Sequence, residues 1–176
     1  HRLDDLAAIF NPKKTIYTTF EFTDIAGLVK GASRGEGLGN KFLANIRETD
    51  AICEVVRCFR DKDITHVDGS VDPVRDVETI NLELVMADLE TVDKRIGKIE
   101  KKAQTGDKEA KAEMDVLEPL KEVLEAGKMA RTLTFNKEEM VYVKQFNLLT
   151  TKPMIYVANM GEEDIEDPNS NPYYIT

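Results

Sequence analysis

The sequence predicts an α/β fold that carries an antiparallel helical hairpin, and three observations lead to this prediction. Two short apolar runs, at 51–59 and 154–159, have the composition of strands buried in a parallel sheet. An alternating, β-prone run at 16–23 ends at Asp24 and leads through a glycine-rich loop into a helix. Apolar residues between 82 and 124 repeat at helical spacing on both sides of a break at 106–107.

Composition sets the broad class. A chain of 176 residues suits one compact domain, or one domain with an insertion. The formal net charge of −9 argues against general electrostatic binding to nucleic acid, so we expect no DNA partner. No apolar run approaches the ~18–20 residues of a membrane span and no signal peptide is visible, so we expect a cytoplasmic protein without a membrane partner. A monomer is also expected, although no sequence feature sets the oligomeric state. Cys53 and Cys58 fall on opposite faces of a strand, which predicts two buried, reduced thiols.

The N-terminal part predicts a short helix followed by a strand. Residues 2–10 place Leu3, Leu6 and Phe10 on one side of a helix, which Asn11-Pro12 ends. The strand is predicted over 15–24. After it, half of the chain's 10 glycines fall between residues 27 and 39, and helical spacing begins at Leu38.

Asp24 and the glycine-rich loop suit a nucleotide site. A carboxylate at the carboxyl end of a strand projects into the crevice where α/β sheets bind ligands. Glycines let the backbone approach phosphate oxygens closely. In P-loop NTPases the Asp of a D-x-x-G element holds Mg²⁺ and the Gly amide faces the γ-phosphate. The alternative is a strand that ends in a solvated Asp before a flexible loop.

The middle of the chain predicts a helical hairpin over 79–127. Gly106 breaks the helix and Asp107 is able to cap the second arm, in which Pro119 predicts a kink or a frayed turn. The apolar seams are narrow and the other faces are charged, which favours a projecting coiled coil over helices packed on a globular core. The seams consist of Leu82, Val85, Leu89, Val92, Ile96, Ile99 and Ala103, and of Ala110, Met114, Leu117, Leu120 and Leu124.

The last part of the chain predicts a helix and a strand. Asn136 and Glu139 form a plausible capping box for a helix that ends at Phe146. The strand 154–159 ends at Asn159-Met160-Gly161-Glu162, and the residues after it form an acidic tail with no readable element. The lone His66 lies in a predicted loop and is expected to be a surface residue.

Three segments together resemble the YchF or Obg-like ATPase family of Obg-related P-loop NTPases. They are TDIAGLVKGASRGEGLGNKFLANIRETDAI, DVETINLELVMADLE with the helices that follow it, and KPMIYVANMGE. The resemblance implies a Ras-like G domain with an inserted antiparallel helical hairpin or coiled coil. It divides the chain into a first G-domain part at 1–78, a hairpin domain at 79–135 and a second G-domain part at 136–176. It also implies hydrolysis of ATP, and possibly GTP, with Mg²⁺ and association with the ribosome.

The resemblance also implies roles for individual residues. Asp24 becomes the Mg²⁺-side carboxylate, acting through water, and Gly27 the γ-phosphate sensor. Asn159, the Met160 backbone and Glu162 form the base pocket, because the family has N-x-x-E where GTPases have N-K-x-D. The Asp of N-K-x-D accepts two hydrogen bonds from guanine that adenine cannot donate. Glu162 stands in its place, so the main preference for guanine is lost. The switch loop consists of Gly31, Ser33, Arg34, Gly35, Glu36, Gly37 and Gly39.

Two departures from the family pattern concern catalysis. Leu28 stands where Ras-type enzymes carry the Gln that orients the attacking water, so the catalytic group stays unknown. The G-x-x-x-x-G-K-[ST] phosphate loop does not occur in the 176 residues, and the switch-I threonine and the C-terminal TGS domain have no counterpart. We therefore expect this chain alone to bind nucleotide weakly and its sheet to expose a central edge. The alternative function is a non-enzymatic module whose hairpin binds a protein or ribosomal RNA.

Overall fold

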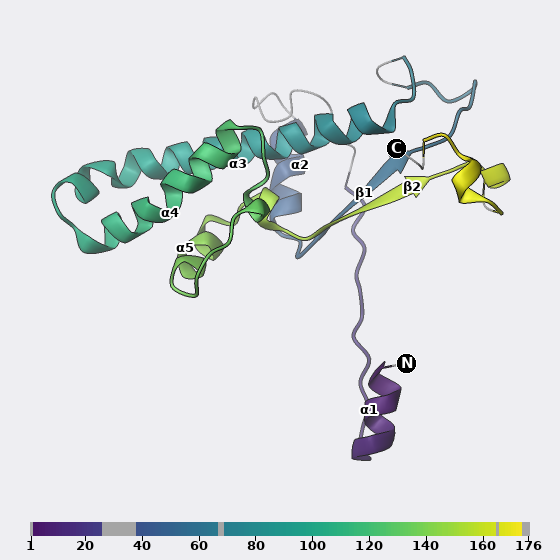
Figure 1. The fold of residues 1–176 in the computed structure, drawn as a ribbon, viewed down its shortest axis with the longest axis horizontal. Coiled ribbons are helices and arrows are strands. Elements are labelled where there is room, and N and C mark those ends of the chain that lie inside the picture. Colours follow the sequence, from purple (N-terminus) through teal and green to yellow (C-terminus); the bar gives the residue numbers. More distant parts are fainter. Residues whose placement is uncertain (1, 26–37, 67–68, 165, 174–176) are drawn as a thin grey trace.

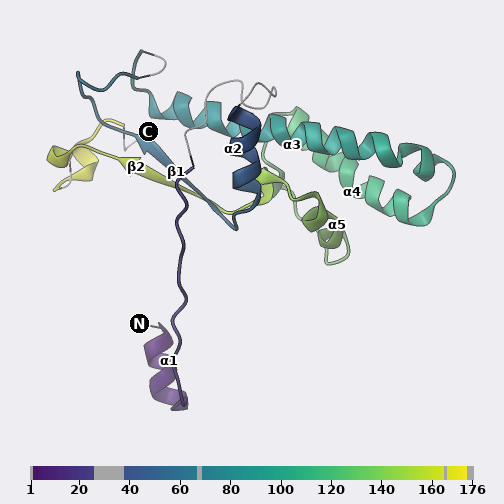
Figure 2. The same cartoon turned by 180° about the vertical axis from the view of Figure 1, so that it is seen from behind.

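The computed structural model describes residues 2–25, 38–66, 69–164 and 166–173 (Figure 1). A two-stranded sheet lies beside a pair of long helices, and a short helix at the N-terminus lies apart from both (Figures 1 and 2). The helices are α1 (Arg2–Phe10), α2 (Leu38–Arg47), α3 (Pro73–Gln104), α4 (Lys108–Glu125) and α5 (Glu139–Phe146), and the strands are β1 (Ile52–Arg57) and β2 (Met154–Asn159). Short 3₁₀ turns are η2 (Ala130–Thr132), η3 (Leu149–Thr151), η4 (Glu162–Asp164) and η5 (Pro168–Ser170).

The two strands pair in parallel, as the sequence predicts. The register runs from Ile52 opposite Met154 to Arg57 opposite Asn159. One face packs on α2 and α3, since Ile52 and Met154 contact a cluster formed by residues of those helices and Leu149. The other face is open in the described part of the chain, where Val55 is 64% exposed and Ile155 59% exposed. Burial on both faces was expected and is wrong here, because the described helices cover only one side.

The predicted strand at 15–24 is an extended, unpaired segment. Phe20 and Phe22 are 85% and 79% exposed, and no described residue pairs with this backbone. A β-prone pattern gives an extended chain, but only hydrogen bonds to a neighbour make a strand. The predicted helix before it is present as α1, yet none of its residues is buried.

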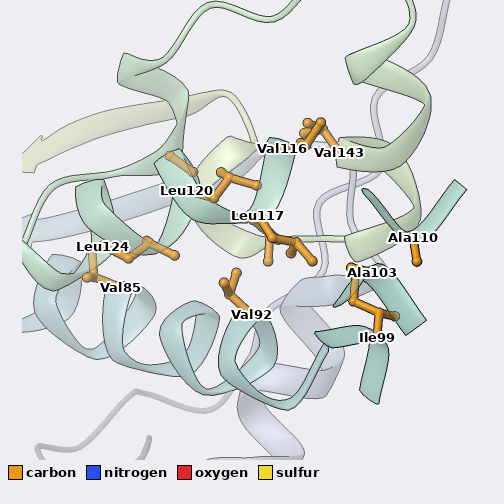
Figure 3. Packing of buried hydrophobic residues seen from close by; sticks show 12 residues of the cluster. Val85, Val92, Ile99, Ala103, Ala110, Val116, Leu117, Leu120, Leu124 and Val143 are labelled. Atoms are coloured by element: carbon orange, nitrogen blue, oxygen red, sulfur yellow. The ribbon is translucent and has the colours of Figure 1, made fainter. Parts of the chain in front are cut away.

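The central helices pack as an antiparallel pair joined by a tight turn (Figures 1 and 3). Asp107 caps α4 by accepting a hydrogen bond from the Ala110 N–H at 2.9 Å, and Gly106 turns the chain at φ +94°. α4 continues through Pro119 as one helix. The shared core consists of Val85, Val92, Ile99, Ala103, Ala110, Val116, Leu117, Leu120 and Leu124, joined by Ala130, Val143 and Leu148. Leu82 of the predicted seam lies outside this core and is 53% exposed.

α3 is longer than predicted and has two buried sides. It begins at Pro73 with Asp72 as its N-cap, so the expected boundary at 78/79 falls inside the helix. Leu84 and Ala87 pack against Leu43 and Ile46 of α2, on a side that the narrow seam does not predict. The first half of α3 is therefore part of the globular core, and only its later turns extend beyond it (Figure 1).

Other local expectations have mixed outcomes. The capping box of α5 is confirmed: Asn136 Oδ1 accepts from the Glu139 N–H at 2.9 Å, and Glu139 Oε2 accepts from the Asn136 N–H at 2.8 Å.

Both thiols are free, but only Cys58 is buried; Cys53 lies on the open sheet face, which corrects the expected burial. No helix within the described ranges is long and apolar enough to cross a membrane.

Candidate functional site at the strand ends

The carboxyl ends of β1 and β2 lie side by side and form the candidate nucleotide-base site. The Cys58 N–H donates to the Asn159 carbonyl at 2.7 Å, so both strands leave the sheet together. The Asn159 and Glu162 side chains are exposed and Met160 is partly buried. Asn159 ends β2 and Glu162 begins η4, so these neighbouring residues lie at the carboxyl edge of the sheet, where parallel sheets bind ligands.

Arg57 organises the loop that leaves β1. Its guanidinium donates to the backbone carbonyls of Phe59 at 3.1 Å and Ile64 at 3.2 Å. The same group lies 4.7 Å from the centre of the Phe59 ring, a cation–π distance. One side chain therefore holds the loop beside the strand ends, a role that the sequence analysis missed.

The C-terminal segment folds back onto the same loop. The Asn171 side-chain amide, 3% exposed, donates to the Cys58 carbonyl at 2.8 Å and to Asp164 Oδ2 at 2.7 Å. Arg60 Nε donates to the Tyr173 hydroxyl at 2.6 Å. The expected structureless tail is wrong, because the segment contains the 3₁₀ turns η4 and η5. Asp167, which accepts from the Asn169 N–H, was a readable turn signal.

On the phosphate side of the predicted site, the structure describes only Asp24 and Gly39. Asp24 is exposed at the end of the extended segment, directly before Ile25, which packs on the cluster under α2. Asp24 makes no hydrogen bond or ion pair with any described residue, so the structure does not join it to the Asn159 loop. Gly39 lies in α2. The other predicted residues, Gly27, Leu28, Gly31, Ser33, Arg34, Gly35, Glu36 and Gly37, lie outside the described residues.

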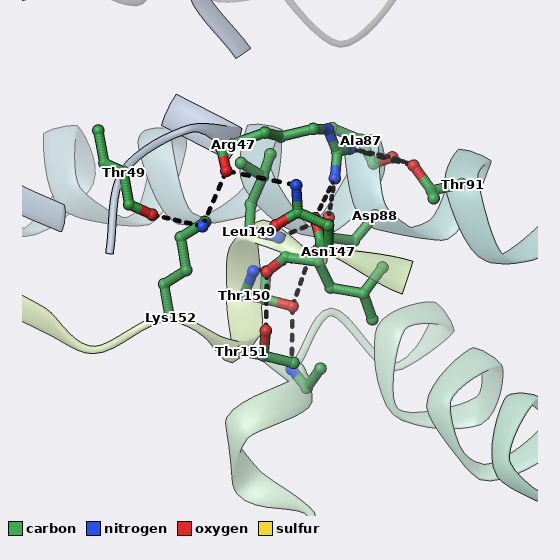
Figure 4. Close-up of polar contacts among 12 residues, drawn as sticks. Arg47, Thr49, Ala87, Asp88, Thr91, Asn147, Leu149, Thr150, Thr151 and Lys152 are labelled. Atoms are coloured by element: carbon green, nitrogen blue, oxygen red, sulfur yellow. Dashed lines mark hydrogen bonds and ion pairs between the residues drawn. The ribbon is translucent and has the colours of Figure 1, made fainter. Parts of the chain in front are cut away.

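The opposite end of the glycine-loop helix is fixed by a polar network around the buried Asp88 (Figure 4). Arg47, the last residue of α2, donates to the Asn147 carbonyl at 2.7 Å and to Thr91 Oγ1 at 3.0 Å, and its guanidinium lies 3.4 Å from Asp88 Oδ1. Lys152 Nζ donates to the Arg47 carbonyl at 3.0 Å. The network ties α2 to α3 and to the segment before β2.

Asp88 is the centre of this network. It is fully buried on α3 and accepts from the backbone N–H groups of Leu149 and Thr150 at 2.9 and 2.7 Å. Burial raises the pKa of Asp88, while the hydrogen bonds from Thr150 and Leu149 and the charge of Arg47 act in the opposite direction. The signal in the sequence was an Asp between the apolar positions Val85, Leu89 and Val92 of α3.

A second carboxyl group, Glu54 on β1, lies in an unusual environment. Its Oε2 atom is buried and has no hydrogen-bond partner among the described residues. Burial, with a smaller contribution from the Asp76 charge, raises the pKa of Glu54 to about 7. Asp76 in turn contacts His66 Nε2 at 2.9 Å, so His66 is partly buried instead of simply solvated. In the described part of the chain, no three or more His, Cys, Asp or Glu side chains form a group that could hold a metal ion.

With this geometry in place, comparison with known proteins identifies the family. The model of the 50S ribosome-binding GTPase family matches residues 8–104, more than half of the chain. The chain belongs to this family. Its fold is accordingly that of a P-loop GTPase, and the predicted relationship to YchF is confirmed by the relatives described next.

Several relatives of this chain are ribosome-binding ATPases named YchF. The chain is 58% identical over 170 residues to the protein of Bacillus subtilis, covering 97% of this chain and 46% of that protein. It is 54% identical over 172 residues to the protein of Haemophilus ducreyi, covering 98% and 47%. A solved structure, the YchF GTPase of Schizosaccharomyces pombe, matches with a TM-score of 0.71 and 39% identity over 93% of this chain and 45% of that one. The chain thus spans about half the length of these proteins.

Proposed function

We propose that this chain belongs to a ribosome-associated switch protein that hydrolyses ATP, and possibly GTP, with Mg²⁺. The observation that carries the proposal is the family membership, together with ribosome-binding ATPases at 52–58% identity over nearly the whole chain. The arrangement of the parallel strand ends supports it, because P-loop proteins bind nucleotide at that edge of the sheet.

In this proposal the loop after β2 binds the base. Asn159 and the Met160 backbone contact the base edge, and Glu162 replaces the shorter Asp that guanine-specific proteins carry. An Asp pairs with the two donors of guanine, whereas Glu162, with one more methylene, cannot take the same bidentate position. The exposure of Asn159 and Glu162 supports the assignment, since both side chains are free to meet a ligand.

The phosphate side of the site is assigned to Asp24 and the loop after it. Mg²⁺ prefers oxygen ligands and is commonly held by one or two carboxylates plus waters and substrate phosphates. The Asp24 carboxylate fits that role, because it is exposed and unpaired among the described residues. When bound, Mg²⁺ would neutralise charge on the phosphates. The Gly27 N–H would donate a hydrogen bond to the γ-phosphate, and the conformation of the switch loop would depend on whether that phosphate is present. Leu28 cannot orient water, so slow intrinsic hydrolysis is expected.

The proposed domain organisation places an inserted hairpin between two parts of a G domain. The first part is 1–78, the hairpin domain is 79–135 and the second part is 136–176, with helix α3 continuing across the first boundary. Because the 176 residues contain no phosphate-loop motif, we expect this chain alone to bind nucleotide weakly or not at all. Isothermal titration with Mg²⁺ and ATP tests this expectation, and micromolar affinity would contradict it.

The decisive experiment uses a full-length protein that contains this chain. Asp24→Ala should abolish Mg²⁺-dependent ATP hydrolysis, measured as phosphate release. Asp5→Ala, which removes an exposed carboxylate on α1, is the matched control and should leave the rate unchanged. Equal rates in both variants would refute the assigned role of Asp24.

A second candidate function is a non-enzymatic module in which the helical pair binds a protein or ribosomal RNA. The observation that favours it is the exposed lysines of α3, namely Lys94, Lys98, Lys101 and Lys102. If this function is correct, Asp24→Ala leaves the rate of Mg²⁺-dependent ATP hydrolysis unchanged. Exchange of the four lysines for glutamate should then remove the protein from sedimenting ribosomes; unchanged sedimentation would exclude contact between these lysines and RNA.

A further inference from the structure

Arg57, the last residue of β1, fixes the backbone of the loop 59–64 that follows the strand. Its Nε donates to the Phe59 carbonyl at 3.1 Å, its Nη1 to the Ile64 carbonyl at 3.2 Å and its Nη2 to the Asp61 carbonyl at 3.4 Å. The side chain is partly buried and makes no ion pair with any residue that the structure describes. Within the described chain, this guanidinium therefore serves one loop.

The same residue lies directly opposite the start of the candidate base loop. Arg57 pairs with Asn159 in the parallel register, and the next residue, Cys58, donates its N–H to the Asn159 carbonyl at 2.7 Å. Paired residues of neighbouring strands stand on the same face of a sheet, about 4.8 Å apart. The buried Asn171 side chain donates to the Cys58 carbonyl at 2.8 Å. The loop 59–64 therefore leaves the sheet from a fixed point beside Asn159.

We propose that Arg57 is a positioning residue for the base of the nucleotide, because it holds the loop 59–64 in place beside Asn159 before ATP binds. The inference rests on the proposed ATP hydrolysis, to which it adds a residue that sets the affinity for the base. A loop that is ordered before the ligand arrives loses less entropy on binding, so its order contributes to affinity. The phosphates are assigned to Asp24 and the loop after it, so Arg57 acts on the base end of the ligand.

A positive charge at this position could also attract the phosphates, and the hydrogen bonds separate the two roles. The three carbonyls are bound by the planar fork of one guanidinium. A lysine ammonium is a compact point charge that cannot reproduce this fork. Arg57→Lys therefore keeps the charge but loses the hold on the loop, whereas Arg57→Gln loses both.

The test measures steady-state ATP hydrolysis by a full-length protein that contains this chain. Because slow hydrolysis is expected, the KM reports the affinity for ATP. Arg57→Gln should raise the KM about five- to tenfold and leave kcat within about twofold, since it removes binding that the ground state and the transition state share. Arg57→Lys should raise the KM about threefold or more. A wild-type KM in Arg57→Lys would show that the charge alone matters and would overturn the proposal.

Inorganic tripolyphosphate, which has the phosphates of ATP but no base, provides the second measurement. Its inhibition constant should be the same in the wild type and in Arg57→Gln. Equal weakening of tripolyphosphate and ATP would overturn an action on the base. Arg131→Gln is the matched control, because the exposed Arg131 also donates to a backbone carbonyl, that of Lys152 at 3.2 Å, but before the start of β2. This variant should change neither constant, and a KM raised as much as in Arg57→Gln would overturn the proposal.

Hydrogen exchange without nucleotide measures the hold on the loop directly. The amides of residues 60–64 should exchange about threefold or more faster in Arg57→Gln than in the wild type, while those of β2 keep their rates. Unchanged exchange in the loop would overturn the proposal. Urea unfolding shows whether each variant is folded, and Arg57→Lys, which keeps the stem and the charge, carries the comparison if Arg57→Gln is unfolded.

The two proposals can fail separately. A wild-type protein that hydrolyses ATP, with the same KM in Arg57→Gln, overturns the role of Arg57 alone. A wild-type protein that neither binds nor hydrolyses ATP refutes the proposed function and, with it, the role of Arg57 towards the base.

Discussion

Asp88 on α3 accepts two hydrogen bonds from Thr150, one from its backbone N–H and one from its hydroxyl, both at 2.7 Å. The Thr150 hydroxyl in turn accepts from the Ala130 N–H at 3.1 Å. A single buried carboxylate therefore joins α3 to the segment that leads into β2, and through Arg47 it also reaches α2.

Asp88→Ala should destabilise the chain by about 3 kcal/mol, because it leaves the N–H groups of Leu149 and Thr150 and the Arg47 charge without their buried partner. Urea unfolding followed by circular dichroism measures the change. Asp115→Ala on the exposed side of α4 is the control, with an expected change below about 0.5 kcal/mol. Similar losses in both variants would show that Asp88 is not a structural centre.

Glu54 should make the stability depend on pH. Its pKa in the folded protein, about 7, lies above the usual 4.5, so the folded protein keeps a proton that the unfolded chain releases. The corresponding stability is present below about pH 4.5 and is lost as the pH rises through 7. Glu54→Gln should therefore stabilise the chain by about 1 kcal/mol at pH 8, after allowance for solvent screening, and have little effect near pH 4. Urea unfolding at both pH values tests this, with the exposed Glu78→Gln as control. A pH-independent difference would contradict it.

Two glycines of the helical pair should respond in opposite directions to the same substitution. Gly97→Ala lies within α3, where an added Cβ meets no atom within 4 Å, and should stabilise the chain by about 0.5–1 kcal/mol. Gly106→Ala has the same free space but a φ of +94°, and should destabilise the chain by about 1 kcal/mol. Melting temperatures of the two variants decide this, and a shift in the same direction would contradict the turn geometry.

The base specificity proposed for the loop after β2 can be changed by substitution in the full-length protein. Met160→Lys with Glu162→Asp restores the N-K-x-D pattern and should raise the kcat/KM for GTP relative to ATP about tenfold or more, since guanine then gains charge-assisted hydrogen bonds. Glu163→Asp, the same chemical change one residue further on, should leave the ratio unaltered. An unchanged ratio in the double variant would remove Glu162 from the base site.

The sequence predicted those elements whose signals are local. The caps by Asp107 and Asn136 and the apolar seam of α3 and α4 depend on residues a few positions apart, and the structure has them. The strand expected at 15–24 failed because pairing depends on a distant partner. The Arg47, Asp88 and Thr150 network and the Asn171 contact join residues 41 to 113 positions apart, and no spacing rule reaches that far. For the candidate site, the loop at Asn159 stays a prediction from the sequence, and the Arg57 and Asn171 contacts around it were not predicted.

The helical pair also has a consequence for the order of folding. Arg47 and Asn147 are 100 residues apart along the chain, and an open loop of that length is entropically costly and slow to close. The helical pair forms from contacts between α3 and α4, which are consecutive in the sequence. Because the two helices are antiparallel, the chain after α4 lies near the first half of α3, close to where β2 pairs with β1. We therefore expect α3 and α4 to gain protection from hydrogen exchange before β1 and β2 in a refolding experiment; simultaneous protection would argue against this order. The helical pair α3 and α4 therefore shortens the loop that must close before β1 and β2 can pair.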